Sequence, residues 1–182
     1  MKQVKDLFDV IVETLLFLII AGGILYFLLC AGVYTAYSAD EQLQRNIDNL
    51  NEKEKVIAIT ILAEARGEGN AGMYAVACVI EQRARNRKLA PSKVCLQPWQ
   101  FSCWNKNDKN RAKLNNLIKT HQHKDYAITL AKNLHRLNRV YSKGADHYCT
   151  LEKKPYWAFN KKTKKWIKPV AIIGNHKFYK LR

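Results

Sequence analysis

The chain has 182 residues, of which 48% are hydrophobic and 25% charged, and these proportions exclude a disordered protein. After one hydrophobic segment near the start, roughly 140 residues remain, which is enough for a core without metals or many disulfides. The net charge is +16: residues 1–39 carry −1 and the rest of the chain carries +17. Such a field attracts polyanions, either nucleic acid or the anionic polymers of a bacterial envelope.

An uncharged run of 20 residues, 15–34, is long enough to cross a membrane as a helix. It is apolar on all faces, which argues against a core helix, and it exceeds the apolar region of a secretory signal. A signal cleaved at Ser38 or Ala39 is the alternative. Two lysines precede the run, whereas the first 15 residues after it hold Arg45 and three acids. This charge balance predicts a cytoplasmic N-terminus.

The charge and hydropathy patterns divide the chain into four parts. These are a cytoplasmic N-terminus (1–14), a transmembrane helix or signal anchor (15–34), a linker (35–50) and one folded domain (51–182). We therefore expect a single-pass protein of the inner membrane with its domain in the periplasm or cell envelope.

The first helix of the domain is predicted to begin after Asn51, which forms an N-cap pair with Glu54, and to end at the glycines beyond residue 66. Spacings of four and three residues place Ile57, Ile61 and Glu64 on one inward face. An acid half-buried among apolar side chains has its charged form disfavoured, which suits a general acid. The alternative is a boundary residue paired to one of three nearby arginines, Arg66, Arg83 or Arg85.

The remaining pattern predicts a mostly helical domain. A second helix is expected from Asn70 as N-cap, with small residues that allow close approach to a neighbouring helix, and a core helix is expected over 126–137. Loops with a short β-hairpin are expected near the C-terminus.

The cysteines and histidines leave the redox state open and indicate no metal. Cys95 and Cys103 are close in sequence, so we favour a disulfide between them, whereas free thiols, with Cys78 buried in a helix, are the alternative. The chain has no H-E-x-x-H and no paired C-x-x-C, although His121 and His123 lie close together. We therefore expect no metal and no cofactor.

Four separated motifs follow one another along the chain: AEARGEGNAGMYAVACVIEQRARN, QPWQFSCWN, GADHYC and IGNHKFYK. In this order they resemble the SleB/CwlJ-type cell wall hydrolases, the spore cortex-lytic enzymes and their non-spore relatives, over residues 57–180. The resemblance implies a mainly α (α+β) domain, compact and similar to lysozyme and lytic transglycosylases, with a small β-hairpin. It makes 51–182 the catalytic domain and peptidoglycan its partner.

The resemblance also implies the reaction. The family's catalytic acid is the first acid of E-A-R-G-E, which is Glu64 here, and it would protonate the oxygen between N-acetylmuramic acid and N-acetylglucosamine. The muramic C6 hydroxyl would then attack and leave a 1,6-anhydro end. A hydrolase needs a second carboxylate at a defined separation, and no acid has the spacing of that partner. We therefore favour lytic transglycosylation, with muramidase-type hydrolysis as the alternative.

The expected substrate-binding residues come from all four motifs: Gln100, Phe101, Ser102, His147, Tyr148, His176, Glu68 and Tyr74. The amide, ring and hydroxyl of Q-F-S suit an N-acetyl sugar, although a loop anchored by buried aromatics is the alternative. The family usually reads G-A-T-H-Y, and this chain has Asp146 in place of that Thr and Cys149 after the Tyr. These departures put in doubt any family contact made through the two side chains.

A non-catalytic, membrane-anchored basic module that binds wall polymer or nucleic acid is the competing function. A degenerate binder has no need of an acid at position 64, so Glu64 favours the enzyme. The paired lysines of 153–165 would suit nucleic acid only in a cytoplasmic domain. We expect no nucleic-acid partner, since the membrane segment predicts a domain outside the cytoplasm.

Overall fold

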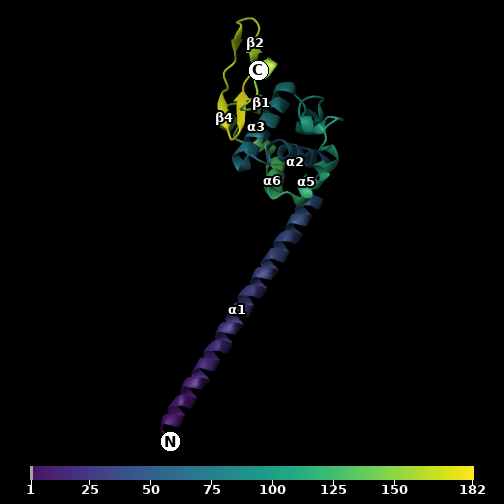
Figure 1. Ribbon diagram of the computed structural model, residues 1–182. Helices are drawn as coiled ribbons and strands as arrows, with labels where there is room; N and C mark the ends of the chain where they lie inside the picture. Colours follow the sequence, from purple (N-terminus) through teal and green to yellow (C-terminus); the bar gives the residue numbers. More distant parts are fainter. Residues whose placement is uncertain (1) are drawn as a thin grey trace. The chain divides into compact units, whose positions relative to one another are not determined.

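The computed structural model describes residues 2–182, with side chains from residue 14 onward except those at 39, 40, 43, 46 and 48. The chain separates into two compact units, Met1–Asp48 and Asn49–Arg182 (Figure 1). Each unit is described below by itself.

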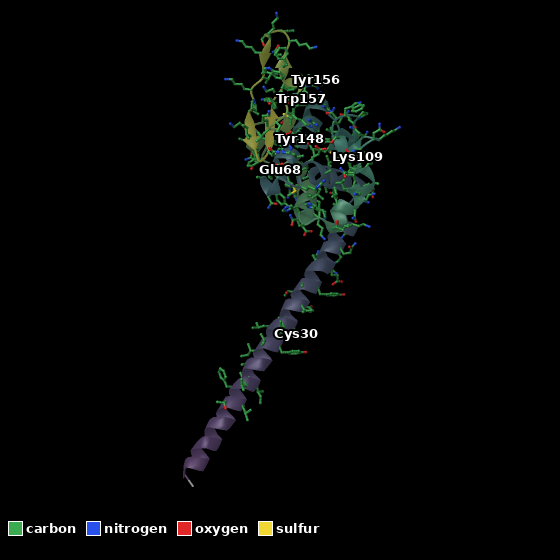
Figure 2. The ribbon with its side chains drawn as sticks, in the orientation of Figure 1. Cys30, Glu68, Lys109, Tyr148, Tyr156 and Trp157 are labelled. Carbon is green, nitrogen blue, oxygen red and sulfur yellow. The ribbon has the colours of Figure 1, made fainter. Side chains whose placement is uncertain are left out.

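The first unit is one continuous helix, α1 (Lys2–Asp48). Its stretch Thr14–Ser38 is long and apolar enough to cross a membrane, by length and composition, and a signal sequence would have the same features. Large apolar side chains on this stretch are exposed, as is Cys30, labelled in Figure 2. The predicted run 15–34 lies inside it. Helical structure also continues through most of the 35–50 segment that was expected to be a linker.

The second unit is built around α2, which packs against each of the other four α-helices of the unit. The predicted capping box is confirmed: the Asn51 side chain accepts from the Glu54 N–H at 2.9 Å, and the Glu54 carboxylate accepts from the Asn51 N–H. Ile57 and Ile61 are buried, as the spacing predicted. In chain order the helices are α2 (Glu52–Ala65), α3 (Gly69–Arg87), α4 (Pro91–Leu96), α5 (Leu114–Thr120) and α6 (Lys124–Lys132).

The second predicted helix, α3, begins at Gly69 with Glu68 as its N-cap, not at Asn70 as expected. Gly69 has φ +63°, a conformation that glycine adopts at no steric cost. The core helix predicted over 126–137 is also shorter, because α6 ends at Lys132. Five short 3₁₀ turns connect the helices and strands: η1 (Ser102–Trp104), η2 (Arg111–Lys113), η3 (Leu134–Arg136), η4 (Arg139–Ser142) and η5 (Tyr156–Ala158).

Two small antiparallel sheets complete the unit (Figure 1). One has the order β1-β5-β4, with Tyr148 opposite Phe178 and Phe178 opposite Ala171. Phe178 packs with Ala75 and Val79 of α3 in a fully buried cluster, so the small residues of α3 bring the sheet against the helix. The strands are β1 (His147–Thr150), β2 (Phe159–Asn160), β3 (Lys165–Trp166), β4 (Ala171–Ile173) and β5 (His176–Tyr179).

The protein is therefore mainly helical with small antiparallel sheets, which confirms the class predicted from the sequence. The β2–β3 pair is the expected short hairpin.

The disulfide predicted between Cys95 and Cys103 is not formed, since all five cysteines are free thiols. Both side chains are buried in the core, Cys95 on α4 and Cys103 in η1. Burial raises the pKa of Cys95 to about 12, so this thiol stays protonated and unreactive. Cys78 is fully buried in α3, in agreement with the alternative interpretation.

Candidate active site

Glu64 lies in the last turn of α2 and is partly buried. The hydroxyl of Tyr148, on β1, donates a hydrogen bond to Oε2 of Glu64 at 2.8 Å. The ring of Tyr148 packs edge-on against His176, with 5.2 Å between ring centroids, and lies 5.7 Å from Phe178. The β1–β5 pairing therefore holds Tyr148 from the side while its hydroxyl reaches the acid.

Tyr148 is fixed as a hydrogen-bond donor by its surroundings. Burial, followed by the negative charge of Glu64, raises the pKa of Tyr148 well above its ordinary value. The phenol therefore keeps its proton at any ordinary pH. A neutral hydroxyl can donate to one carboxylate oxygen of Glu64, and the Cys103 thiol interacts with the same carboxylate.

The turn η1 forms the other boundary of Glu64. Cys103 is buried there, and burial followed by the charge of Glu64 raises the pKa of its thiol. The next residue, Trp104, donates from Nε1 to Oγ1 of Thr60 at 2.8 Å. Thr60 lies four residues before Glu64 on α2, so these contacts hold η1 along the helix that carries the acid.

Arg83 on α3 is a buried cation close to this centre. The sequence pattern indicated only that it could pair with Glu64. Its Nε donates to the backbone carbonyl of Asp146 at 2.6 Å, its Nη1 donates to the carbonyl of Gln100 at 3.2 Å, and its guanidinium lies 5.0 Å from the Phe101 ring centroid. Burial lowers the pKa of Arg83, and the negative charges of Asp146 and Glu64 oppose that effect.

The interpretation of Glu64 as an ion-paired boundary residue is wrong for the part of the chain that the structure describes. No arginine nitrogen there lies within 4.0 Å of its carboxylate. Arg66 instead donates to the carbonyl of Ala63, and Arg85 pairs with Glu81 at 2.7 Å. The positive charge of Arg83 acts on Glu64 from a longer distance.

An open hollow of about 700 Å³ borders η1. Trp104 and Ser102 from η1 line it, together with the strongly exposed Trp99. Trp104 connects this hollow to α2 through its hydrogen bond to Thr60. The other lining residues lie on either side of η1, from the end of α4 to the start of η2: Leu96, Gln97, Pro98, Asn105, Lys106, Asn107, Asp108 and Arg111.

Of the three Q-F-S residues, Ser102 faces this hollow and the other two have structural contacts. Oε1 of Gln100 accepts from Nη2 of Arg87 at 2.6 Å. Phe101 is only 1% exposed beneath Arg83, so its ring has no face available for a sugar. The expected stacking role of Phe101 is corrected: it is a core residue, as the alternative interpretation proposed.

Glu68 and His176 support Tyr148: His176 packs against its ring, and Glu68 lies close to His176. Oε2 of Glu68 accepts from the backbone N–H of Asn175 at 2.5 Å and lies 3.9 Å from Nδ1 of His176. His176 is 6% exposed, and its Nδ1 has no hydrogen-bond partner among the described residues. Glu68 therefore fixes the β4–β5 turn, and through β5 it supports the ring that packs on Tyr148.

Among the described residues, Tyr148 is the one expected substrate-binding residue with a hydrogen bond to Glu64, and His147 and Tyr74 have other partners. His147 points its Nδ1 to Oδ1 of Asp146 at 2.9 Å and packs on Trp157, labelled in Figure 2. Asp146, the residue that departs from the family pattern, is 2% exposed, so its carboxylate contacts His147 from inside the fold. The hydroxyl of Tyr74 accepts from the backbone N–H of Asn138 at 2.8 Å and lines a separate, smaller hollow.

The histidines and acids gather nowhere into a metal site: among the described residues no three His, Cys, Asp or Glu side chains could hold a metal ion. The His121 and His123 rings lie 5.6 Å apart without a third such neighbour.

A partly buried carboxylate beside an open hollow lined by tryptophan, amide and hydroxyl groups is typical of proteins that act on polysaccharides. The chain belongs to the cell wall hydrolase family, whose model matches residues 67–179. Membership implies an enzyme that degrades peptidoglycan and a domain that acts outside the cytoplasm. Glu68 lies inside the matched residues and Glu64 lies just before them. No curated protein and no solved structure matches the chain significantly.

Proposed function

We propose that the domain cleaves peptidoglycan glycan strands between N-acetylmuramic acid and N-acetylglucosamine, with Glu64 as the general acid. The observation that carries this proposal is the hydrogen bond from Tyr148 to Oε2 of Glu64 in a partly buried position. The Tyr148 hydroxyl holds the carboxylate in one orientation, and in this proposal Glu64 carries the transferred proton. The hollow beside η1 offers a neighbouring surface for the strand.

In the proposed reaction Glu64 gives its proton to the glycosidic oxygen, and the bond from that oxygen to the muramic C1 breaks. The muramic C6 hydroxyl attacks C1, its proton returns to the Glu64 carboxylate, and a 1,6-anhydro end forms. No water is consumed. Cys103 is a neutral thiol, and Arg83 donates its hydrogen bonds to the backbone carbonyls of Asp146 and Gln100, so neither competes as the acid.

Hydrolysis by a muramidase mechanism is the second candidate, and Asp108 supports it. Asp108 lines the hollow, and its charge and that of Glu64 both act on the Cys103 thiol. Of the other acids considered, Asp146 is buried and Glu68 holds the Asn175 turn. A carboxylate pair about 5–5.5 Å apart would act with retention, and a pair about 6.5–9.5 Å apart with inversion.

The family resemblance implies a fold similar to lysozyme and lytic transglycosylases, and we propose that fold for this domain together with lytic transglycosylation. Here α2 carries Glu64, and β1 supplies its tyrosine partner. A wall-binding module without catalysis is the weaker proposal, since it gives no reason for the directed contact between these two side chains.

The proposed location is the inner membrane, with the N-terminus in the cytoplasm and the domain in the periplasm or cell envelope. The exposed apolar stretch Thr14–Ser38 supports a single membrane anchor, and the lysines before it support this orientation. A membrane anchor would hold the domain close to its polymer. We propose no nucleic-acid partner and no cofactor.

The test is cleavage of purified peptidoglycan by the full chain in detergent, with Glu64→Gln beside the unsubstituted protein. We expect Glu64→Gln to remove cleavage while circular dichroism stays unchanged, and exposed Glu152→Gln to retain full activity as the matched control. Full activity in Glu64→Gln would refute the role of this acid.

Mass spectrometry of the products separates the two reaction types. Products with 1,6-anhydro ends support transglycosylation, and reducing ends support hydrolysis. Asp108→Asn sharpens this comparison: it should abolish hydrolysis by a carboxylate pair and leave a single-acid reaction largely intact.

A further inference from the structure

The hollow beside η1 combines apolar walls with two cationic side chains. Trp99 and Trp104 contribute aromatic surface, Lys106 and Arg111 contribute two positive charges, and Asp108 contributes one negative charge. Its volume of about 700 Å³ lies in the range of sites that enclose a small ligand. Neutral sugars need the aromatic and amide groups but not the cations, so the charge calls for a separate reason.

Trp99 is the first sign of a ligand. Its side chain is 84% exposed, and its backbone has φ +66°, a conformation that side chains other than glycine rarely adopt. The domain thus keeps a large aromatic residue in solvent and in a strained conformation, both of which disfavour folding. Strain and exposure at one residue that lines a hollow point to a binding role.

Arg111 is the second sign. Its guanidinium lies 5.6 Å from the Trp104 ring centroid, and Nη1 donates to the Trp104 carbonyl, so the side chain is held at the hollow. No carboxylate of the described residues lies within 4.0 Å of it. An arginine has five N–H donors in a planar fork that matches a carboxylate. A preorganised guanidinium without an acidic partner suits an anionic group of the ligand.

Two neighbouring residues of η1 connect the hollow to the candidate active site. Trp104 lines the hollow and donates to Thr60, one helical turn before Glu64. Cys103, the residue before Trp104, interacts with Glu64 itself. A glycan strand extends over several sugar units, so one strand can be proposed to contact both Glu64 and the hollow.

We propose that this hollow is a subsite for a carboxylate-bearing amino sugar, in which Trp99 and Trp104 contact the sugar ring and Arg111, with Lys106, binds the carboxylate. The inference rests on the proposed function and deepens it by naming what distinguishes the substrate. The domain prefers strands with carboxylates near the cleaved bond over an uncharged N-acetylglucosamine polymer. Two sources supply that carboxylate: the bare lactyl group of muramic acid, or the stem peptide attached to it.

The experiment measures binding without cleavage, in the full chain in detergent micelles with Glu64→Gln. Three ligands are titrated by calorimetry: an N-acetylglucosamine oligomer, peptide-free glycan strands and peptide-bearing strands of equal length. We expect Arg111→Gln to weaken binding of at least one carboxylate ligand about tenfold and to leave the uncharged oligomer within twofold. Trp99→Ala should weaken all three.

Lys109→Gln is the matched control, because Lys109 is an exposed cation of the same loop that does not line the hollow (Figure 2). It should leave all three affinities unchanged. Whichever carboxylate ligand responds to Arg111→Gln identifies the source of the carboxylate. Arg111→Lys keeps the charge and loses the fork, so it should give an intermediate loss and serves if Arg111→Gln does not fold.

Equal effects of Arg111→Gln and Lys109→Gln, or equal affinity of the unsubstituted site for charged and uncharged ligands, would overturn the subsite. The proposed function fails separately, through intact cleavage in Glu64→Gln or absent cleavage by the unsubstituted chain. Binding and cleavage are measured on different proteins, so each failure is recognised on its own.

Discussion

Tyr148 and Glu64 are 84 positions apart in the sequence, and the tyrosine hydroxyl donates a 2.8 Å hydrogen bond to the carboxylate. The bond joins the end of α2 to β1, and it fixes the direction in which the acid presents its remaining oxygen. Hydrogen bonds to charged groups are stronger than neutral ones, so this contact holds the Glu64 side chain in one orientation.

Removal of that hydroxyl tests its role as a positioning group. We expect Tyr148→Phe to lower kcat about tenfold, which corresponds to about 1.4 kcal/mol, because Glu64 loses its orienting donor while the ring packing remains. KM should change little. Tyr156→Phe, at an 85% exposed tyrosine, is the control. An unchanged kcat in Tyr148→Phe would mean that the contact does not position the acid.

Loss of the Glu68 carboxylate should destabilise the β4–β5 turn. Glu68→Ala removes the acceptor of the Asn175 N–H, so we expect a loss of about 1–2 kcal/mol in the free energy of unfolding. Urea denaturation of the domain measures this loss of stability, and Glu152→Ala is the exposed control. If Glu68 instead acts only on substrate, its replacement will reduce activity and leave the midpoint of urea unfolding unchanged.

Phe101 should respond as a core residue. Phe101→Ala leaves a cavity at a 1% exposed site beneath Arg83, and we expect a loss of about 3–5 kcal/mol in the free energy of unfolding. Trp99→Ala, in the same loop but 84% exposed, should change stability by less than about 0.5 kcal/mol. A stable Phe101→Ala with weakened glycan binding would restore the stacking role.

His147 should make the domain less stable in acid. Burial lowers the pKa of His147 below its ordinary value of 6.5, although the hydrogen bond with Asp146 opposes this. The unfolded chain therefore binds the proton first. The contribution of His147 to stability is complete above about pH 6.5 and is lost as pH falls toward its folded-state pKa.

We expect His147→Gln to remove this part of the pH dependence. Urea unfolding at pH 7.5 and at pH 5 measures it, and the variant should lose less stability than the unsubstituted chain between the two. An equal loss in both proteins would assign the acid sensitivity to other groups.

Local features were predictable from the sequence because their causes lie within a few residues. The Asn51 capping box, the inward face of α2 and the apolar stretch of α1 depend on spacing along one helix. Four motifs in order also indicated the cell wall hydrolase family, which the match over 67–179 confirms. The proximity of Glu64 to the end of its helix follows from the same local rules.

Only the tertiary structure decided which distant groups meet that acid. Tyr148 reaches Glu64 because β1 pairs with β5 and β5 packs on α3, and none of these steps is visible in a local pattern. Phe101 was a candidate sugar contact in the sequence, whereas in the fold its ring is buried beneath Arg83.

The tertiary structure also decided whether the cysteines form a disulfide. Nearness in sequence favoured a bond between Cys95 and Cys103, whereas the fold keeps both as buried free thiols. The sequence by itself thus determined the first helix of the domain, the apolar segment and the candidate acid. The surroundings of that acid depended on packing between segments far apart in the chain, because burial and charge neighbours are properties of the assembled core.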